Sequence, residues 1–536
     1  MTANPIRPAE GPRAGGAQAG RRWLQALALT GAAGFWLLLQ GLALTRTGGA
    51  MEYPLDDVYI HLAMAVEIAR GGYGVNPGQP ASAASSILYP LLLTPFAGSE
   101  AQRWLPLMWN LAALVANALL WGAILARAGL GAGRAATLGA VLALLGPLAL
   151  NMAGVAFLGM EHALHLTATL AVVLGLQRFV AERRVGWLLA AGIVAGPMLR
   201  FEGLAISGLA SAVLLLGGRP RAAIGLGILA LAPVAGFAAF LHGLGLDPVP
   251  NSVRAKFDAG LAAVPAPMLH KRLALFMANL HTPEGAALGI LSAGLLLAGL
   301  TGAARGRARL LALAGGVAGL AHLILSQIGW LHRYEIYALT FCAGVAIALA
   351  GRFLAGAGAG AALGRALAVL ALAAGVVRYA GAMAVEGPLA ARAIFLQQRQ
   401  MARLVTEHLR GPVAVNDLGW VAWASDWPVL DLWGLASARA LAVRLSDPPA
   451  GWAGPLVRDA GVRLVMIYDS WLGRAVDPGW VRLGALVLTG RWAAVGDDRV
   501  ALYAPNPGDA PALRAVLAAF ARDLPRGAEL RLAPGG

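Results

Sequence analysis

The sequence is poor in cysteine and in charge for a chain of 536 residues. Its single cysteine, Cys342, cannot form a disulfide within the chain, so a fold held together by disulfide bonds is excluded. Charged residues make up only 13% of the sequence and hydrophobic residues 58%, which excludes an ordinary soluble domain. This balance predicts a polytopic membrane protein.

Acidic residues are also scarce, because 27 Asp and Glu face 42 Lys and Arg, giving a formal net charge of +15. In a soluble protein such an excess would suggest a nucleic-acid partner. Here nearly all of the positive charge is arginine, and the arginines lie between hydrophobic runs. We therefore interpret them as determinants of membrane topology that contact lipid headgroups, and we expect no nucleic-acid partner.

Long hydrophobic runs are abundant and predict about eleven membrane spans. The predicted spans are 23–45, 104–126, 135–152, 162–180, 187–199, 203–217, 222–243, 285–303, 309–328, 335–351 and 366–385. Arg21 and Arg22 precede the first run, which is too long for a signal peptide and is followed by no persuasive cleavage site. We expect this run to remain as an uncleaved first span.

Arginine clusters in alternate connections predict the orientation of the chain. They place the N terminus in the cytoplasm, and they place the loop 46–103 and the residues after about 386 on the outer face. The high content of Ala, Gly and Arg is typical of a GC-rich bacterium. The expected location is therefore the bacterial inner (plasma) membrane, crossed several times.

The sequence changes character near residue 386, where shorter alternating runs replace the long apolar ones. The segments "PVAVND", "WPVLDLW" and "RLVMIYD" predict strands, and 391–410 and 511–523 predict helices. We expect an α-helical polytopic transmembrane domain over residues 1–385. A small extracytoplasmic α/β domain is expected to follow it over residues 386–536.

Within the outer loop 46–103, two adjacent aspartates, Asp56 and Asp57, precede Tyr59 and His61. The pattern that follows predicts a helix that ends at a pair of glycines, and an aspartate at its N-cap would stabilise it by about 1 kcal/mol. One cap needs only one aspartate. A second carboxylate at the edge of a membrane domain is costly unless it faces water, a cation or a substrate. Capping and catalysis are both open interpretations of this pair.

Further polar residues interrupt the hydrophobic runs in connections assigned to the outer face. They are Glu161, Arg200, Glu202, Asn251, Arg254, Lys256, His332, Arg333 and Tyr334. Each has a simple structural explanation, such as an interfacial anchor, a turn or a buried ion pair between Arg200 and Glu202. Together they predict one outward-facing cavity surrounded by acidic and basic groups.

These motifs, in order along 46–436, resemble the bacterial members of the GT-C glycosyltransferase superfamily, in particular the group that contains mycobacterial arabinofuranosyltransferases. "DDVYI" and "NPGQ" resemble the DDAYI and NPGE of that family's first outer loop. "GMEH" resembles its GMET, "LRFEG" its TRPEG, "PNSVRAK" its PNTFYAK, and "HRYEIY" its R-Y-x-x-P stretch. "NDLGW" and "DLWGL" resemble the D-x-G and D-x-x-GL elements of its outer domain. The ordered set is specific, although each piece alone is weak.

The resemblance implies an inverting glycosyltransferase with a GT-C-like membrane domain. It would transfer a sugar from a polyprenyl-phosphate donor to a glycan, lipid or protein of the cell envelope. Asp56 aligns with the family's catalytic acid and is expected to be the general base. Asp57 is expected to position the acceptor or to bind a divalent cation, Mg²⁺ or Mn²⁺.

The remaining candidates are expected to bind the substrates. Arg254, Lys256 and Arg333 would stabilise the leaving phosphate, and membrane lipid would surround the polyprenyl tail. Tyr59, His61 and Glu161 would line the sugar pocket, and the C-terminal domain would bind the acceptor.

Two other functions are consistent with the same residues. A transporter or flippase of lipid-linked sugars also needs charged residues and broken helices within the membrane. Against it, the polar groups gather at one face instead of the midplane, and no internal repeat is visible. The other alternative is a non-catalytic scaffold for envelope assembly.

Overall fold

The computed structural model describes residues 14–259 and 267–534, with side chains at 18–255 and 267–534. Eight helices of this described part are long and apolar enough to cross a membrane. They are α1 (Ala14–Arg46), α4 (Trp104–Arg127), α7 (His162–Glu182), α10 (Pro220–Gly243), α13 (Pro283–Leu300), α14 (Gly306–Leu325), α15 (Ile336–Leu354) and the continuous helical run Ala359–Leu409. The chain is therefore a multi-pass membrane protein.

Three further apolar helices are shorter, namely α5 (Ala136–Ala149), α8 (Trp187–Leu199) and α9 (Gly203–Leu216). Each predicted hydrophobic segment thus folds as a helix, although only eight are long enough to cross a membrane by length and composition. Helix α7 lies in the middle of the bundle, with 78% of its most apolar window buried, whereas α10 has only 11% buried. The apolar side chains that α10 exposes, including Ile224 and Ile228, suit a lipid-facing position.

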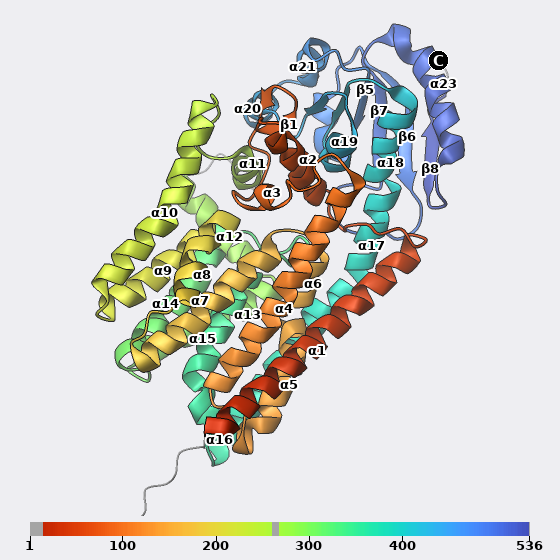
Figure 1. Ribbon diagram of the computed structural model, residues 1–536. Coiled ribbons are helices and arrows are strands. Elements are labelled where there is room, and N and C mark those ends of the chain that lie inside the picture. Colours follow the sequence, from red (N-terminus) through yellow and green to blue (C-terminus); the bar gives the residue numbers. More distant parts are fainter. Residues whose placement is uncertain (1–13, 260–266, 535–536) are drawn as a thin grey trace, which may run out of the picture.

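The last apolar run connects the bundle to the C-terminal domain without a break in the helix (Figure 1). It consists of α16 (Ala359–Gly375), the π-helix η3 (Val376–Gly381), α17 (Ala382–Leu396), α18 (Gln398–Arg403) and the π-helix η4 (Leu404–Leu409). Residue 386, where the sequence changes character, lies inside α17.

Short elements fill the connections at the domain end of the bundle. They are α2 (Asp57–Ala69), β1 (Gly74–Asn76), β2 (Gln79–Pro80), α3 (Tyr89–Leu92), η1 (Glu100–Arg103), α6 (Met152–Phe157), α11 (Asn251–Ala259) and α12 (Met268–Leu280), with η2 (Gly133–Ala135) at the other end. The predicted helix after the aspartate pair is α2, and Gly71 ends it because its φ of 85° is accessible to glycine.

The C-terminal domain contains a six-stranded sheet in the order β4-β3-β5-β7-β6-β8. The strands are β3 (Val413–Val415), β4 (Val429–Asp431), β5 (Leu464–Ile467), β6 (Val481–Leu488), β7 (Arg499–Ala504) and β8 (Ala528–Leu532). Strands β4, β3 and β5 are parallel, and the others pair antiparallel. The three predicted strands are β3, β4 and β5, which confirms a small C-terminal α/β domain.

Both faces of this sheet are covered, because alternate residues of a strand point to opposite sides. Leu464 and Met466 of β5 join the large core that continues into the membrane bundle, whereas Val465 and Ile467 join a second core. The helices of the domain are α19 (Gly419–Ala424), α20 (Ala438–Leu445), α21 (Ala453–Asp459), α22 (Asp469–Leu472) and α23 (Ala510–Phe520), with η5 (Gly473–Ala475), η6 (Pro507–Asp509) and η7 (Ala521–Asp523). The sheet is therefore anchored to the bundle through one of its faces.

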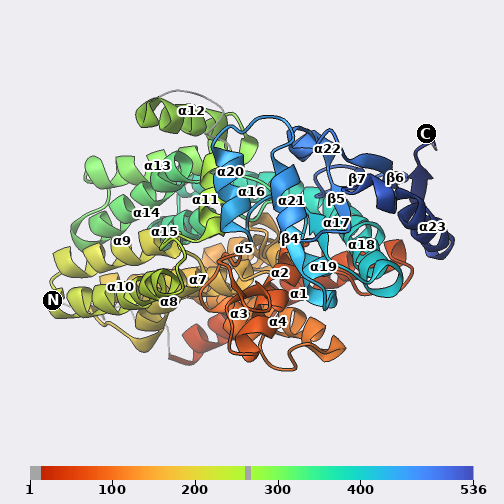
Figure 2. The same cartoon turned by 90° about the horizontal axis from the view of Figure 1, so that it is seen from above.

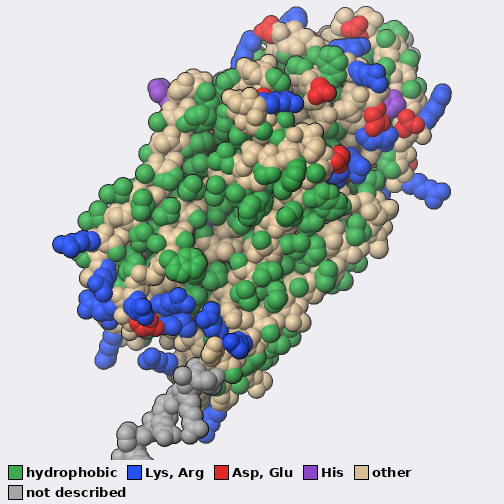
Figure 3. All heavy atoms as spheres, in the orientation of Figure 1, with side chains coloured by type: hydrophobic (Ala, Val, Ile, Leu, Met, Phe, Trp, Pro, Cys, Tyr) green, Lys and Arg blue, Asp and Glu red, His purple; other side chains and the backbone are tan. Residues whose placement is uncertain are grey.

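The domain covers one part of the bundle only. Figures 1 and 2 show it over α2 and α17, while α8–α10 and α12–α14 lie to one side of it. In Figure 3, hydrophobic side chains cover the middle of the visible face, and Lys and Arg gather at the end opposite the C-terminal domain. The acidic side chains in that view lie mainly over the domain.

Candidate functional site

A cavity of about 590 Å³ opens in the uncovered part of the bundle. We call it the groove. Its walls are mostly apolar side chains of α9, α11, α12, α14 and α15, including Leu275 and Leu325. Arg200 contacts both Glu202 and Tyr334 and forms a charged part of the lining with them, and Arg272 and Gln327 line the groove as well. An apolar groove with a charged part is suited to a ligand that has a lipid tail and an anionic head.

We call the charged part of the groove, with the residues that contact it, the groove head. It contains Asp57, His61, Ser85, Glu161, Arg200, Glu202, Arg333 and Tyr334. The predicted Arg200–Glu202 ion pair is confirmed, with 2.6 Å between NH2 and Oε1. NH1 of Arg200 also donates to Oε1 of Glu161 at 2.7 Å. Two carboxylates thus compensate one buried guanidinium.

Glu161 is the most deeply placed member of the groove head, with 0% of its surface exposed. It lies at the N-cap of α7, and Ser85 Oγ donates to its Oε1 at 2.7 Å. His61 Nε2 lies 3.4 Å from its Oε2. These contacts bring the outer loop 46–103 and the start of α7 together with the turn between α8 and α9. Burial alone would raise the pKa of Glu161, but His162, His61 and the Arg200 guanidinium together lower it well below its usual range.

Arg333 connects the groove head to Asp57. Its NH2 lies 3.2 Å from Oδ2 of Asp57 and 3.2 Å from the hydroxyl of Tyr334, which lines the groove. The Arg333 side chain is only 1% exposed, whereas that of Asp57 is 27% exposed. Nε and NH1 of Arg333 make no hydrogen bond to any residue that the structure describes. Buried guanidinium donors of this kind are suited to bind an anion.

The backbone before Arg333 is strained. Three successive residues, Trp330, Leu331 and His332, have φ values of 49°, 56° and 51°. Left-handed conformations cost of the order of 1 kcal/mol each for residues with a Cβ. Such strain persists only where surrounding contacts stabilise it, so this turn is held in place by its neighbours.

Asp56 has a different environment from Asp57, because it belongs to the contact between the outer loop and the C-terminal domain. Its Oδ2 accepts from the backbone N–H of Gly419 at 2.6 Å, and its Oδ1 accepts from Trp420 at 2.9 Å. Asp56 therefore caps α19 and makes no side-chain cap to its own helix α2. A Cβ at Gly419 would lie 2.1 Å from the carbonyl oxygen of Asp56, so this close approach requires glycine.

This geometry argues against Asp56 as the general base, the role expected from the sequence. The residue is only 6% exposed, and both carboxylate oxygens already accept hydrogen bonds from the backbone. Burial and the nearby Asp417 carboxylate raise its pKa, whereas the two N–H donors lower it. Burial also raises the pKa of Asp417 to about 6, although Gln398 and Tyr468 donate hydrogen bonds to it.

Tyr59 belongs to the same contact and does not line a sugar pocket as expected. It is 0% exposed, and its hydroxyl donates to Glu52. Its ring stacks on Trp420 with 4.4 Å between the ring centroids, and Trp420 Nε1 donates to Glu52 at 3.0 Å. We call this contact the α2–α19 junction, formed by Glu52, Asp56, Tyr59, Gly419 and Trp420.

The other predicted residues divide between the groove and the surface. The N–H of Asn251 donates to Ser82, which attaches α11 to the outer loop. Arg254 forms an ion pair with Asp247 at 3.1 Å, and both side chains are more than 30% exposed, so Arg254 does not join the groove head. The side chain of Lys256 lies outside the described residues.

His332 also lies outside the groove head. Its Nδ1 is 3.1 Å from Oε1 of Glu284, and its Nε2 is 3.6 Å from Oε2 of Glu386. Within the described part of the chain, Asp57 belongs to no group of three side chains spaced to hold a metal ion. Glu284 is not among the residues predicted from the sequence, because it follows a threonine N-cap and a proline and therefore resembles an ordinary first-turn glutamate.

One family model matches part of the chain. A domain of unknown function (DUF8728) matches residues 392–503, which include α18 and strands β3 to β7. No curated protein matches the sequence. The match covers most of the C-terminal domain and does not extend into the groove.

Proposed function

We propose that this protein is a GT-C-type glycosyltransferase that takes a sugar from a polyprenyl-phosphate donor and transfers it to an acceptor of the cell envelope. The observation that supports this best is the groove, because its apolar walls lead to a charged head. A polyprenyl chain fits the walls, and a phosphodiester fits the head. The order of sequence motifs along residues 46–436 supports the same reaction class.

The donor phosphate binds at Arg333 and Arg200 in this proposal. Arg333 has two buried N–H groups without a described partner, and Arg200 lines the groove. Negative charge increases on the phosphate oxygen as the bond to the anomeric carbon breaks, so a guanidinium placed there stabilises the transition state. A divalent cation, if the reaction needs one, would act at the same phosphate.

Asp57 is the general base in this proposal, and Asp56 is a positioning residue. The Asp57 carboxylate is partly exposed and lies beside Arg333, whereas both oxygens of Asp56 are occupied at the α2–α19 junction. Asp57 takes the proton of an acceptor hydroxyl while that oxygen attacks the anomeric carbon from the face opposite the phosphate. The bond to phosphate then breaks with its electron pair remaining on oxygen, which inverts the anomeric centre.

The C-terminal domain lies beside Asp57 and so provides a place for the acceptor. The arginine-rich end of the bundle (Figure 3) faces the cytoplasm by the positive-inside rule. The groove head and the C-terminal domain then face the outside of a bacterial inner membrane. This arrangement would allow transfer to a glycan, lipid or protein of the envelope.

Binding of undecaprenyl phosphate, the leaving group of such a donor, tests the proposal directly. Native mass spectrometry of the full chain in detergent would compare wild type, Arg333→Gln and the control Arg254→Gln, whose side chain is in a surface pair. We expect wild type and Arg254→Gln to retain the lipid, and Arg333→Gln to lose about tenfold or more in affinity. Equal binding by all three would overturn the donor site.

A further inference from the structure

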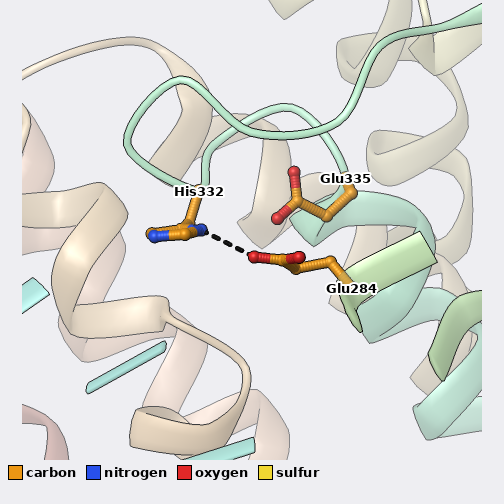
Figure 4. A group of neighbouring side chains, drawn as sticks. All are labelled: Glu284, His332 and Glu335. Atoms are coloured by element: carbon orange, nitrogen blue, oxygen red, sulfur yellow. Dashed lines mark ion pairs between the residues drawn. The ribbon is translucent and has the colours of Figure 1, made fainter. Parts of the chain in front are cut away.

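A second polar group lies on the other side of the strained turn at His332. It consists of Glu284 in the first turn of α13, His332, and Glu335 at the N-cap of α15. Their exposed fractions are 3%, 6% and 0%. Figure 4 shows these side chains converging from separate segments, with the Glu335 carboxylate directed toward the other two. No step of the proposed transfer uses them.

These side chains carry polar atoms that the described residues leave unsatisfied. Neither ring nitrogen of His332 makes a hydrogen bond, although both are within ion-pair distance of a glutamate. Oε1 of Glu335 also makes none, and its Oε2 accepts from the N–H of Gly329 at 3.1 Å. Buried polar atoms nearly always have a partner, so unsatisfied atoms from two adjacent side chains indicate a ligand between them.

The charges around His332 are also unbalanced. The carboxylates of Glu284, Glu335 and Glu386 surround it, and Arg378 is the cation that contacts Glu284. With the three carboxylates ionised, Arg378 and a protonated His332 leave the group with a net charge of −1, and a metal ion that displaces the imidazole proton would face a net charge of −2. A divalent cation neutralises this group.

We propose that Glu284, His332 and Glu335 bind a divalent transition-metal ion. One ligand atom from each residue lies within 4.8 Å of the others. Ligands at about 2.1 Å from a zinc ion can be at most about 4.2 Å apart, so small side-chain rotations close the site. An imidazole with two carboxylates matches Zn²⁺ or Mn²⁺ better than Mg²⁺ or Ca²⁺, which prefer oxygen ligands alone.

The ion would add to the His332–Glu284 ion pair and connect the first turn of α13 with the turn that carries His332 and Glu335. It would fix the left-handed turn Trp330–His332, and Arg333 follows this turn directly. The π-helix η3 packs beside the site, since it carries Arg378 and also Tyr379, whose ring lies 5.7 Å from that of His332. The metal is therefore a structural ion that holds the arginine of the groove head in place.

Metal analysis of the full chain tests this inference without an activity assay. The protein would be purified through an affinity tag that contains no histidine, without chelators, and its metals measured by inductively coupled plasma mass spectrometry. The variants are Glu335→Gln, which removes a ligand, and Glu386→Gln, which removes a neighbouring carboxylate outside the ligand group. We expect a metal ion stoichiometric with the chain in wild type and Glu386→Gln, and at least about tenfold less in Glu335→Gln.

Thermal unfolding of wild type provides the second measurement, which does not depend on a variant that folds. EDTA should lower the apparent Tm by several degrees, and ZnCl₂ or MnCl₂ added in excess should restore it. Wild-type protein that carries no transition metal and has the same Tm with and without EDTA would overturn the site. That result would mean that the three side chains are held together by ion pairs of a protonated His332 with Glu284 and Glu386, without a metal ion.

Discussion

The α2–α19 junction contains Asp56 and the groove head contains the adjacent Asp57. The two sites contain similar kinds of residue, but their charged side chains have different hydrogen-bond partners. At the junction both oxygens of Asp56 accept backbone hydrogen bonds, and Glu52 accepts from Tyr59 and Trp420. At the groove head Arg333 pairs with Asp57 through one nitrogen and leaves two others without a described partner. Glu52 Oε2 at the junction also makes no hydrogen bond to a described residue, although Arg399 lies 3.6 Å away. The contrast therefore lies between Asp56, whose two oxygens are both occupied by backbone donors, and Arg333, whose buried nitrogens are suited to bind an anion.

The difference extends to the sequence separation of the contacts. Asp56 and Gly419 are 363 residues apart, so the junction joins the outer loop to the C-terminal domain. The groove head is formed by the outer loop together with helix ends of the bundle. The junction therefore fixes the position of α2, and through α2 the position of Asp57.

Removal of the buried cation of the groove head should have the largest effect on stability. Arg200→Ala leaves Glu161 buried without its main counter-charge, and we expect a loss of about 3–5 kcal/mol. The matched control is Arg254→Ala, which breaks an exposed pair and should cost at most about 1 kcal/mol. Apparent Tm values of the two variants in the same detergent decide the point, and equal losses would refute a buried charge network at the groove head.

The adjacent aspartates should separate into a structural and a functional residue. Asp56→Ala leaves two buried N–H groups of α19 without an acceptor, so we expect a loss of about 1–3 kcal/mol. Asp57→Asn keeps an oxygen that can accept from the buried Arg333, so it should cost less stability than Asp56→Ala. Thermal unfolding measures this difference, and limited proteolysis should cut near the junction faster in Asp56→Ala only. The reverse order would contradict the assignment of the junction.

A further effect concerns pH. The pKa of Asp417 is raised to about 6 from an ordinary value of 3.8, so the folded protein binds a proton that the unfolded chain releases between these values. This group therefore destabilises the fold as pH rises from about 4 to 6, by about 3 kcal/mol, and adds nothing further above pH 6.

The variant Asp417→Asn isolates this contribution. The Tm of wild type minus that of Asp417→Asn should fall as pH rises from 4 to 6 and then stay level. A difference that does not vary with pH would show that Asp417 titrates normally in the folded protein.

Local signals in the sequence predict a large part of the fold. Long apolar runs predict the helices, the glycine pair after α2 predicts its end, and a short continuous apolar run predicts β5. The Arg200–Glu202 pair was also predictable, because only one residue separates its members and both lie between two apolar segments.

The roles of the aspartates could not be predicted in this way. Which aspartate caps a helix depends on the position of α19. Nothing in the sequence indicates that Gly419, the first residue of α19, contacts Asp56. Likewise, the burial of Tyr59 could not be predicted, because it depends on stacking with Trp420, which is distant in sequence. In the group of Glu284, His332 and Glu335, the last two are close in sequence, but only the fold brings the distant Glu284 to them.

The profile of envelope glycans and glycolipids tests the central claim most directly. Mass spectrometry would compare cells that lack the gene with cells that express wild type, Asp57→Asn or Asp56→Asn at equal protein levels. Wild type should restore one sugar increment, Asp57→Asn should reduce transfer by about 10²–10⁴-fold, and Asp56→Asn should retain much more of it. Full restoration by Asp57→Asn would contradict a transferase that uses this carboxylate as its base.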